Sequence, residues 1–203
     1  KKAEIIVILK PGKPPSEVSS YRPISLLPVL GKLFEKLYIK RLLKIVNKKN
    51  LILNEQFGFR QKHSTIEQLH RITNFIEKAL EKGQYCNAVF LDVAQTFDRV
   101  WHQRLIFKLS KILPANHVSI LSSYVSNRSF RVRFEDSYSE FLPIRAVVPQ
   151  GSVLSPLLYS LFSSDIPKPT GNSKMGIFAD DTAVFSAAPS HRETVNVLQD
   201  CLG

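Results

Sequence analysis

The most informative stretch of the sequence is Gly176-Ile177-Phe178-Ala179-Asp180-Asp181-Thr182-Ala183-Val184-Phe185. Two adjacent aspartates separate two apolar runs that contain the β-branched and aromatic residues typical of strands. Aspartate tolerates turn conformations, so this pattern predicts a β-hairpin with Asp180 and Asp181 at its tip. An aspartate pair alone does not indicate chemistry, because ordinary turns use the same residues.

Another aspartate stands in a matching context earlier in the chain. Asp92 follows the apolar run Ala88-Val89-Phe90-Leu91, for which we expect a buried strand over residues 86–93. If the two strands are neighbours, Asp92 and Asp180 can face each other, and two close carboxylates need a cation or a shared proton between them. Hard oxygen ligands without nearby His or Cys favour Mg²⁺ over zinc. These residues therefore indicate either a two-metal nucleotidyl transferase or purely structural acids.

Composition narrows the class of protein. The chain has 203 residues, of which 44% are hydrophobic and 22% charged, which excludes global disorder and collagen-like structure. Two cysteines argue against a disulfide scaffold, and no apolar run reaches the ~18 residues of a membrane span. Lys and Arg total 28 against 17 Asp and Glu, a net charge of +11. This excess favours a nucleic-acid or anionic-membrane partner, and solubility alone is the other explanation.

Two stretches predict long amphipathic helices. Ser64 and Glu67 form a capping box that opens a helix ended by Gly83. We expect its buried face to consist of Ile66, Leu69, Ile72, Phe75, Ile76 and Leu80. Residues 32–49 predict a helix whose basic outer face either contacts nucleic acid or is only solvated. Its expected inner positions are Leu33, Phe34, Leu37, Leu42, Ile45 and Val46.

The remaining elements alternate without a regular strand–helix–strand rhythm. We expect strands at 5–9 and 130–134, a hairpin partner within 141–148, and helices at 103–111, 117–126 and 154–163. Ser190 and Glu193 form a capping box for a last helix with Val195, Leu198 and Leu202 inward. This order favours an α+β fold over a doubly wound sheet.

Six sequence blocks occur in an order that is characteristic of one family. They are Lys10-Pro11-Gly12-Lys13, Ser20-Tyr21-Arg22-Pro23-Ile24-Ser25-Leu26-Leu27, Asn54-Glu55-Gln56-Phe57-Gly58-Phe59-Arg60, Phe90-Leu91-Asp92-Val93 with Phe97-Asp98-Arg99-Val100-Trp101-His102, Pro149-Gln150-Gly151-Ser152-Val153-Leu154-Ser155-Pro156, and Phe178-Ala179-Asp180-Asp181. The chain resembles the reverse transcriptase of non-LTR (LINE-type, jockey-like) retrotransposons over nearly its whole length.

The resemblance implies the fingers and palm of a right-hand polymerase. We expect an α+β fold with an antiparallel palm sheet, helices packed on one face of it, and the thumb absent. The implied division is fingers at 1–85, palm with the first catalytic strand at 86–112, a fingers/palm insertion at 113–145, and palm with the Pro-Gln-Gly loop and Asp-Asp hairpin at 146–203. The chain lacks an initial methionine, so we expect an excerpt of a longer polyprotein.

The resemblance also assigns site residues. Asp92, Asp180 and Asp181 are implied as catalytic, and Asp92, Asp180 and the Val93 carbonyl as ligands of two Mg²⁺ ions, for which Mn²⁺ can substitute. Phe97 is expected beneath the sugar of the incoming nucleotide, where it would exclude a 2′ hydroxyl, or else as a core aromatic. Gln150 and Gly151 are expected to line the nucleotide pocket.

Cations and nucleic-acid contacts complete the implied site. Arg60, Lys62 and Arg22 are expected to hold the triphosphate, with ordinary surface charge as the alternative. The residues expected at the nucleic acid are Lys32, Lys36, Lys40, Phe178 and Ala179. The implied partners are an RNA template, a DNA primer, deoxynucleoside triphosphates and the rest of the polyprotein, including an endonuclease and the thumb. No membrane partner is expected, and the resemblance implies the nucleus or a cytoplasmic ribonucleoprotein as the location.

Three positions depart from the family pattern. Val147 stands where glycine is usual, and Gln95 and Thr96 replace a lysine and a small residue. The leading interpretation is an RNA-directed DNA polymerase, incomplete or decayed in this copy. A non-catalytic nucleic-acid-binding relic is the second interpretation. Another palm-type polymerase, such as a maturase or an RNA-directed RNA polymerase, is the third, and Phe97 argues against ribonucleotide use.

Overall fold

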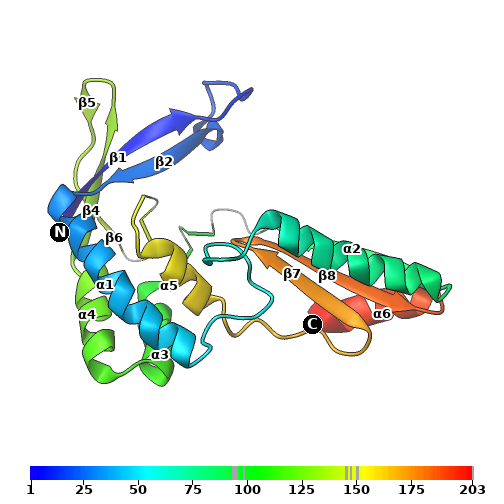
Figure 1. The fold of residues 1–203 in the computed structure, drawn as a ribbon. Coiled ribbons are helices and arrows are strands. Elements are labelled where there is room, and N and C mark those ends of the chain that lie inside the picture. Colours follow the sequence, from blue (N-terminus) through cyan, green and yellow to red (C-terminus); the bar gives the residue numbers. More distant parts are fainter. Residues whose placement is uncertain (93–95, 98, 145, 147, 150, 203) are drawn as a thin grey trace. The chain divides into compact units, whose positions relative to one another are not determined.

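A computed structural model describes residues 1–92, 96–97, 99–144, 146, 148–149 and 151–202 (Figure 1). The chain forms two compact units. The first unit comprises Lys1–Leu51 and Gln95–Phe162, and the second comprises Ile52–Ala94 and Ser163–Gly203. None of the helices in the described ranges is both long and apolar enough to cross a membrane. The assignment of fingers and palm to particular residue ranges remains a prediction.

The second unit is built on a three-stranded antiparallel sheet. Its order is β3 (Tyr85–Leu91), β8 (Asp181–Ala188), β7 (Ser173–Phe178). Strands β7 and β8 pair from Ser173 opposite Ser186 to Phe178 opposite Asp181. The predicted hairpin is therefore confirmed, but its two-residue connection is Ala179-Asp180, and Asp181 begins β8 instead of lying at the tip.

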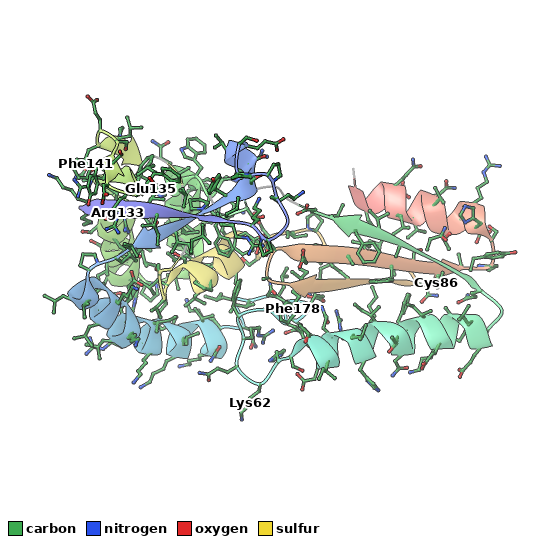
Figure 2. The ribbon with its side chains drawn as sticks, turned by 90° about the horizontal axis from the view of Figure 1, so that it is seen from above. Lys62, Cys86, Arg133, Glu135, Phe141 and Phe178 are labelled. Atoms are coloured by element: carbon green, nitrogen blue, oxygen red, sulfur yellow. The ribbon has the colours of Figure 1, made fainter. Side chains whose placement is uncertain are left out.

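Helices cover both faces of this sheet (Figure 2). On one face, Met175, Ile177 and Val184 form a core cluster with Leu198 of α6 (His191–Leu202). On the other face, Gly176 lies so close to α2 (Thr65–Glu81) that an added Cβ would stand 2.7 Å from a methyl carbon of Ile72. The expectation of helices on one face is wrong for this sheet, because consecutive buried residues of β7 point to opposite sides and both sides need cover.

The predicted helix starts are confirmed. The backbone N–H of Glu67 donates to Ser64 Oγ at 3.2 Å, and Ser64 N–H donates to the Glu67 carboxylate at 2.8 Å. Glu193 N–H likewise donates to Ser190 Oγ at 3.3 Å ahead of α6. Gly83 follows α2 with φ +65°, a conformation that glycine adopts without strain.

The predicted burial is wrong in part for α2 and for β3. On the predicted face of α2, Ile66, Leu69 and Leu80 are exposed, whereas Ile72, Phe75 and Ile76 are half-buried. Among the described strands, β3 pairs with β8 alone and forms an edge of the sheet, and Phe90 is 77% exposed. An apolar run predicts a strand, but it does not distinguish an edge strand from a central one.

The first unit contains a mixed sheet. Strand β1 (Lys2–Leu9) pairs antiparallel with β2 (Tyr21–Leu26), which follows the short 3₁₀ helix η1 (Val18–Ser20), and parallel with β4 (Arg128–Phe134). Strand β4 also pairs with β5 (Ser137–Tyr138) and β6 (Leu142–Ile144). The strands expected near 5–9 and 130–134 are confirmed, and so is the hairpin partner within 141–148. Strand β2 is not among the predicted strands. It lies at the edge of the sheet, where Pro23 is tolerated.

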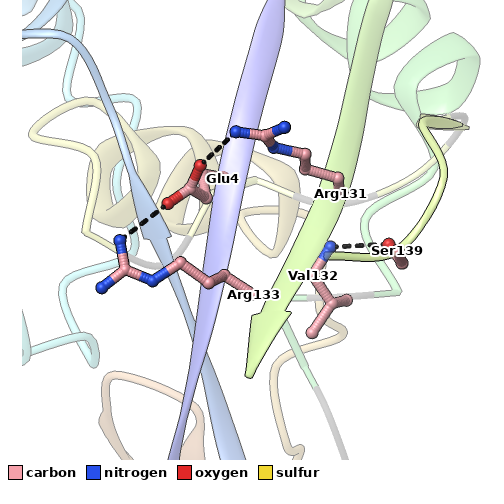
Figure 3. A network of polar contacts seen from close by, with 5 residues as sticks. All are labelled: Glu4, Arg131, Val132, Arg133 and Ser139. Atoms are coloured by element: carbon pink, nitrogen blue, oxygen red, sulfur yellow. Dashed lines mark hydrogen bonds and ion pairs between the residues drawn. The ribbon is translucent and has the colours of Figure 1, made fainter. Parts of the chain in front are cut away.

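An ion-pair network joins β1 to β4 (Figure 3). Arg131 and Arg133 donate to the two carboxylate oxygens of Glu4 at 2.9 and 3.3 Å. The hydrogen bond from Arg131 is the main cause that lowers the pKa of Glu4. Because all three side chains are partly exposed, the network contributes little stability and mainly favours the observed register, in which Glu4 lies opposite Arg131.

Four helices accompany this sheet: α1 (Val29–Lys48), α3 (His102–Ile112), α4 (Ala115–Val125) and α5 (Ser155–Phe162). They confirm the four helices expected in this part of the sequence. The buried stripe of α1 is Glu35, Tyr38, Leu42 and Val46. Leu33, Phe34 and Leu37 were expected to be buried but are exposed. The buried positions start at Glu35 and recur every three or four residues, as on one face of a helix.

Candidate active site

The predicted aspartates lie at one end of the β3-β8-β7 sheet. Asp92 follows β3 directly, and Leu91 pairs with Thr182, so extending the register by one residue places Asp92 opposite Asp181. Directly opposite residues of antiparallel strands have Cβ atoms about 4.5–5.5 Å apart. Asp180 lies in the turn itself and is half-buried, whereas Asp92 and Asp181 are exposed.

A cavity opens where these strands meet α2. It has a volume of about 360 Å³ and contains Asp92 and Asp181 in its lining, together with Phe90, Phe178 and Gln68. The structure thus brings two of the three predicted catalytic acids to one cavity, and the turn that carries the third adjoins it.

The turn has an unusual backbone. Ala179 and Asp180 connect the paired residues Phe178 and Asp181, and Ala179 has φ +60°. A positive φ at the first central residue is a feature of type II′ hairpin turns, where glycine is the usual residue. A residue with a Cβ in this region is strained, and such strain persists where the surroundings hold it in place.

The loop before α2 runs alongside β7. Gln56 forms a parallel bridge with Ile177. Phe57 N–H donates to the Ile177 carbonyl at 2.9 Å, and Ile177 N–H donates to the Glu55 carbonyl at 3.0 Å. The loop therefore occupies the outer edge of β7 and leads directly to the aspartate turn.

One buried carboxamide bonds the turn on both sides. Gln56 Nε2 donates to the Ala179 carbonyl at 2.9 Å, and Gln56 Oε1 accepts from Ala179 N–H at 2.9 Å. The same oxygen accepts from Gly58 N–H at 2.8 Å. The Gln56 residue is 2% exposed. The hairpin tip is thus held by a side chain that lies 123 residues away in the sequence.

Gly58 allows this approach. A Cβ added to it would stand 2.0 Å from the Ala179 backbone nitrogen and 2.7 Å from its Cα. No side chain fits there without displacing the turn, because real Cβ atoms do not approach backbone atoms so closely. The Gln-x-Gly spacing of the sequence block therefore has a geometric cause.

Further polar side chains hold the same strand and loop. Gln68 Nε2 donates to the carbonyls of Ile177 and Glu55, both at 3.1 Å. Arg71 Nη2 donates to the Met175 carbonyl. Arg60 Nη1 donates to two loop carbonyls, of Leu53 at 3.1 Å and of Gln56 at 3.2 Å. Arg60 thus stabilises the loop, and its expected contact with a triphosphate stays a prediction.

Within the described part of the chain, no group of three or more His, Cys, Asp and Glu side chains is placed to hold a metal ion. The donor set of the cavity nevertheless fits a hard divalent cation, since its acidic residues Asp92 and Asp181 offer only oxygen atoms. The remaining ligands of such an ion would come from water and substrate.

Comparison with protein families identifies the chain. Residues 8–203 match the family described as reverse transcriptase (RNA-dependent DNA polymerase). The chain belongs to the reverse transcriptase family. Membership implies the use of divalent metal ions and of a nucleic-acid template and primer. The resemblance to reverse transcriptases that the sequence blocks indicated is therefore confirmed.

Its relatives include transposon proteins of flies. This reverse transcriptase is 46% identical over 209 residues to a Drosophila melanogaster protein named "Probable RNA-directed DNA polymerase from transposon BS", and covers 23% of it. It is 44% identical over 209 residues to the RNA-directed DNA polymerase from mobile element jockey of the same species, and again covers 23%. Both alignments include 100% of this chain, which therefore spans about a quarter of the curated relatives.

Solved structures support the fold. A telomerase from Candida Tropicalis in complex with a fragment of telomeric RNA aligns with 98% of this chain and 37% of its own, with a TM-score of 0.67 and 13% identity. The apo telomerase from the same organism aligns with a TM-score of 0.65 and 15% identity. The mixed α/β architecture expected of a polymerase fingers and palm is confirmed by these likenesses.

The other predicted residues of the reverse transcriptase are distributed over both units. Lys62 is exposed in the second unit, with φ +60° (Figure 2). Arg22 on β2 and Lys36 and Lys40 on α1 are exposed in the first unit, and Lys32 is half-buried. Phe97 is half-buried, and its ring centroid lies 5.2 Å from that of Tyr159. The residues outside the described ranges are Val93, Gln95, Val147 and Gln150.

Gly151 belongs to a loop of the first unit. The sequence analysis did not identify the side chains that hold this loop. Glu35 of α1, 2% exposed, accepts hydrogen bonds from Ser152 Oγ at 2.9 Å and from Val153 N–H at 2.6 Å. Tyr124 Oη donates to the same carboxylate at 2.6 Å, and burial raises the pKa of Tyr124 to about 12. Gly151 has φ +103° and lies close to the Ser25 carbonyl. The sequence did contain a signal for this role, since Glu35 is the single acidic residue of the basic helix α1.

Proposed function

We propose that this chain carries the catalytic carboxylates of an RNA-directed DNA polymerase of a non-LTR retrotransposon. The observation that carries the proposal is the pairing of β3 with β8, which brings Asp92 and Asp181 to one cavity beside the Asp180 turn. The reaction is addition of a deoxynucleotide to a DNA 3′ end on an RNA template.

In this proposal Asp92, Asp180 and the Val93 carbonyl would be ligands of two Mg²⁺ ions, and Asp181 would support these ligands. The bound ions would lower the pKa of the primer 3′ hydroxyl and neutralise the leaving pyrophosphate. The carboxylates orient the reacting oxygens for in-line displacement at the α-phosphate. Phe97, Gln150 and Gly151 line the nucleotide pocket, and Arg60, Lys62 and Arg22 hold the triphosphate.

Nucleic-acid binding in the proposal rests on charge and on backbone contact. The net charge of +11 supports attraction to phosphates, whose counterions are released on binding. Lys32, Lys36 and Lys40 recur every four residues along α1, so they share one side of the helix. With Phe178 and Ala179 they would contact template and primer, while base pairing supplies sequence selectivity.

Single-nucleotide addition to a DNA primer annealed to RNA tests the proposal. The unmodified chain is compared with Asp180→Asn and with the control Asp200→Asn, which removes an exposed acid from α6 in the same unit. We expect metal-dependent addition by the unmodified chain and the control, and a loss of about 100-fold or more in Asp180→Asn. Salt-sensitive filter binding without addition would instead establish the non-catalytic relic. Absence of both would contradict the proposal.

A further inference from the structure

The aspartate turn needs an external support for its backbone. Its first central residue, Ala179, has φ +60°, where an alanine is less stable than a glycine. The ladder of β7 and β8 ends at the pair Phe178 and Asp181, so the turn lies beyond the last paired residues. The strain at Ala179 is therefore offset by groups outside the hairpin.

The Gln56 carboxamide supplies this support in one orientation only. Its oxygen faces the N–H groups of Ala179 and Gly58, and its nitrogen faces the Ala179 carbonyl. A flipped amide would direct its N–H₂ at two N–H donors and its oxygen at a carbonyl. Since the whole residue is buried, such mismatches are costly, and the side chain is locked with its partners.

The lock controls both peptide groups that flank Ala179. Its N–H belongs to the peptide that joins it to Phe178, and its carbonyl belongs to the peptide that joins it to Asp180. With both peptide planes held, the direction in which the Asp180 Cα–Cβ bond leaves the chain is restricted. Gly58 lies against the same backbone atoms, and its lack of a side chain lets the loop bring the Gln56 amide to the turn.

We propose that Gln56 is a positioning residue that holds the catalytic turn in its strained backbone conformation and thereby sets the geometry of the Asp180 carboxylate. The consequence for the reaction rests on the function proposed above, whereas the lock itself does not. In this proposal Gln56 acts through the backbone of Ala179, to which its amide is bonded.

Hydrogen exchange and metal binding test the proposal on the 203-residue chain. Gln56→Met keeps the unbranched shape of the side chain and removes both hydrogen-bonding atoms. Gln56→Asn keeps an amide but withdraws it by one methylene. The control Asn87→Leu removes a half-buried amide of the same unit that bonds Thr194 at 2.7 Å and has no bond to the turn. The amide of Val184, paired with Val89 inside the sheet, reports that the unit remains folded.

We expect the Ala179 amide to exchange about tenfold faster in Gln56→Met than in the unmodified chain, with Val184 still protected, because one buried hydrogen bond to this amide is lost. The affinity for Mn²⁺, followed by the electron paramagnetic resonance signal of the free ion, should fall about tenfold in both Gln56 variants and stay unchanged in Asn87→Leu. In nucleotide addition, kcat should fall while KM for the nucleotide changes less.

Equal Ala179 exchange and equal Mn²⁺ affinity in the unmodified chain and both Gln56 variants would overturn the proposal. Failure of the proposed polymerase function has a different signature. The unmodified chain would then add no nucleotide, while exchange at Ala179 would still separate the Gln56 variants from the control and support the lock.

Discussion

The aspartate turn of the second unit and the Gly151 loop of the first unit are each held by one buried side chain, but the two side chains have opposite chemistry. Gln56 both donates and accepts, and its partners are backbone groups of Ala179 and Gly58. Glu35 only accepts, and two of its three partners are the hydroxyls of Ser152 and Tyr124. A hydroxyl can exchange donor and acceptor roles, whereas a backbone N–H or carbonyl cannot. We therefore expect replacement of Gln56 to destabilise the turn more than replacement of Glu35 destabilises the loop.

The largest expected loss of stability comes from substitution of the glycine beside each of the two supports, Gly58 and Gly151. Gly58→Ala would place a Cβ 2.0 Å from the Ala179 nitrogen, and we expect a loss of about 3 kcal/mol in the free energy of unfolding. Gly151→Ala meets the Ser25 carbonyl only at 3.1 Å but has φ +103°, so about 2 kcal/mol is expected from backbone strain. Urea denaturation followed by circular dichroism measures both. A smaller loss for Gly58→Ala than for Gly151→Ala would contradict the close packing of the loop on the turn.

The exchange Gln56→Glu should be the next most damaging. An ionised carboxylate would face the Ala179 carbonyl in a buried site, and we expect a loss of about 2–3 kcal/mol at neutral pH. A protonated carboxyl can donate to that carbonyl and still accept from the N–H groups, so acid should restore the variant. Burial would raise the pKa of the new carboxyl above its unfolded value of about 4.3.

The sign of this pH dependence follows from the raised pKa. The deficit relative to the unmodified chain should be full above the folded pKa and should disappear as the pH falls below the unfolded pKa. Charged neighbours from each packed element bear on the result, namely Arg60 and Glu55 in the loop, Arg71 in α2, and Asp180 and Asp181 in the hairpin. Denaturation at a series of pH values measures the deficit, and a constant deficit across the series would refute the donor role of the Gln56 amide.

The reverse exchange, Glu35→Gln, sharpens the contrast. The new amide can keep its oxygen toward Val153 N–H and direct its nitrogen at Tyr124, whose hydroxyl then accepts. We expect a loss of about 1 kcal/mol at neutral pH, because each polar partner of the side chain can still be matched by the amide. The same denaturation series provides the measurement. A loss equal to that of Gln56→Glu would remove the distinction between hydroxyl and backbone partners.

The smallest expected effect is that of Tyr124→Phe. It removes the hydrogen bonds to Glu35 and Ser152, and we expect a loss of about 1 kcal/mol at neutral pH. Because burial raises the pKa of Tyr124 to about 12, its contribution is complete below its unfolded pKa of about 10 and is lost as the pH rises through the folded value. The variant should therefore lose less stability than the unmodified chain between about pH 10 and 12, as alkaline titration of the unfolding free energy would reveal. An identical alkaline decline would contradict this assignment.

Part of the fold could be predicted because its causes are local. The hairpin at 176–185 and the capping boxes at Ser64 and Ser190 depend on residues only a few positions apart, and all three are confirmed. The exposure of Phe90 and Leu33 could not be predicted. Their apolar character shows only that burial would be favourable, whereas the neighbours available decide whether it occurs.

The candidate site likewise has a part that could be predicted from local sequence and a part that could not. The sequence predicted a strand that ends at Asp92 and a hairpin at Asp180-Asp181, but it left open whether the two strands are neighbours. The structure pairs them, and the register extends to place Asp181, not Asp180, opposite Asp92. The roles of Gln56 and Glu35 were not predicted. Each side chain bonds a segment more than a hundred residues away, and nothing in its immediate sequence names that partner.

Residue types and short spacings were enough to predict the family, the order of most elements and the positions of the acids in the sequence. Only the tertiary structure decided that helices cover both faces of the β3-β8-β7 sheet, and which buried amide holds the strained turn. The physical reason is that a buried polar group is stable only with a matched partner, and long-range packing alone brings the Gln56 amide to Ala179.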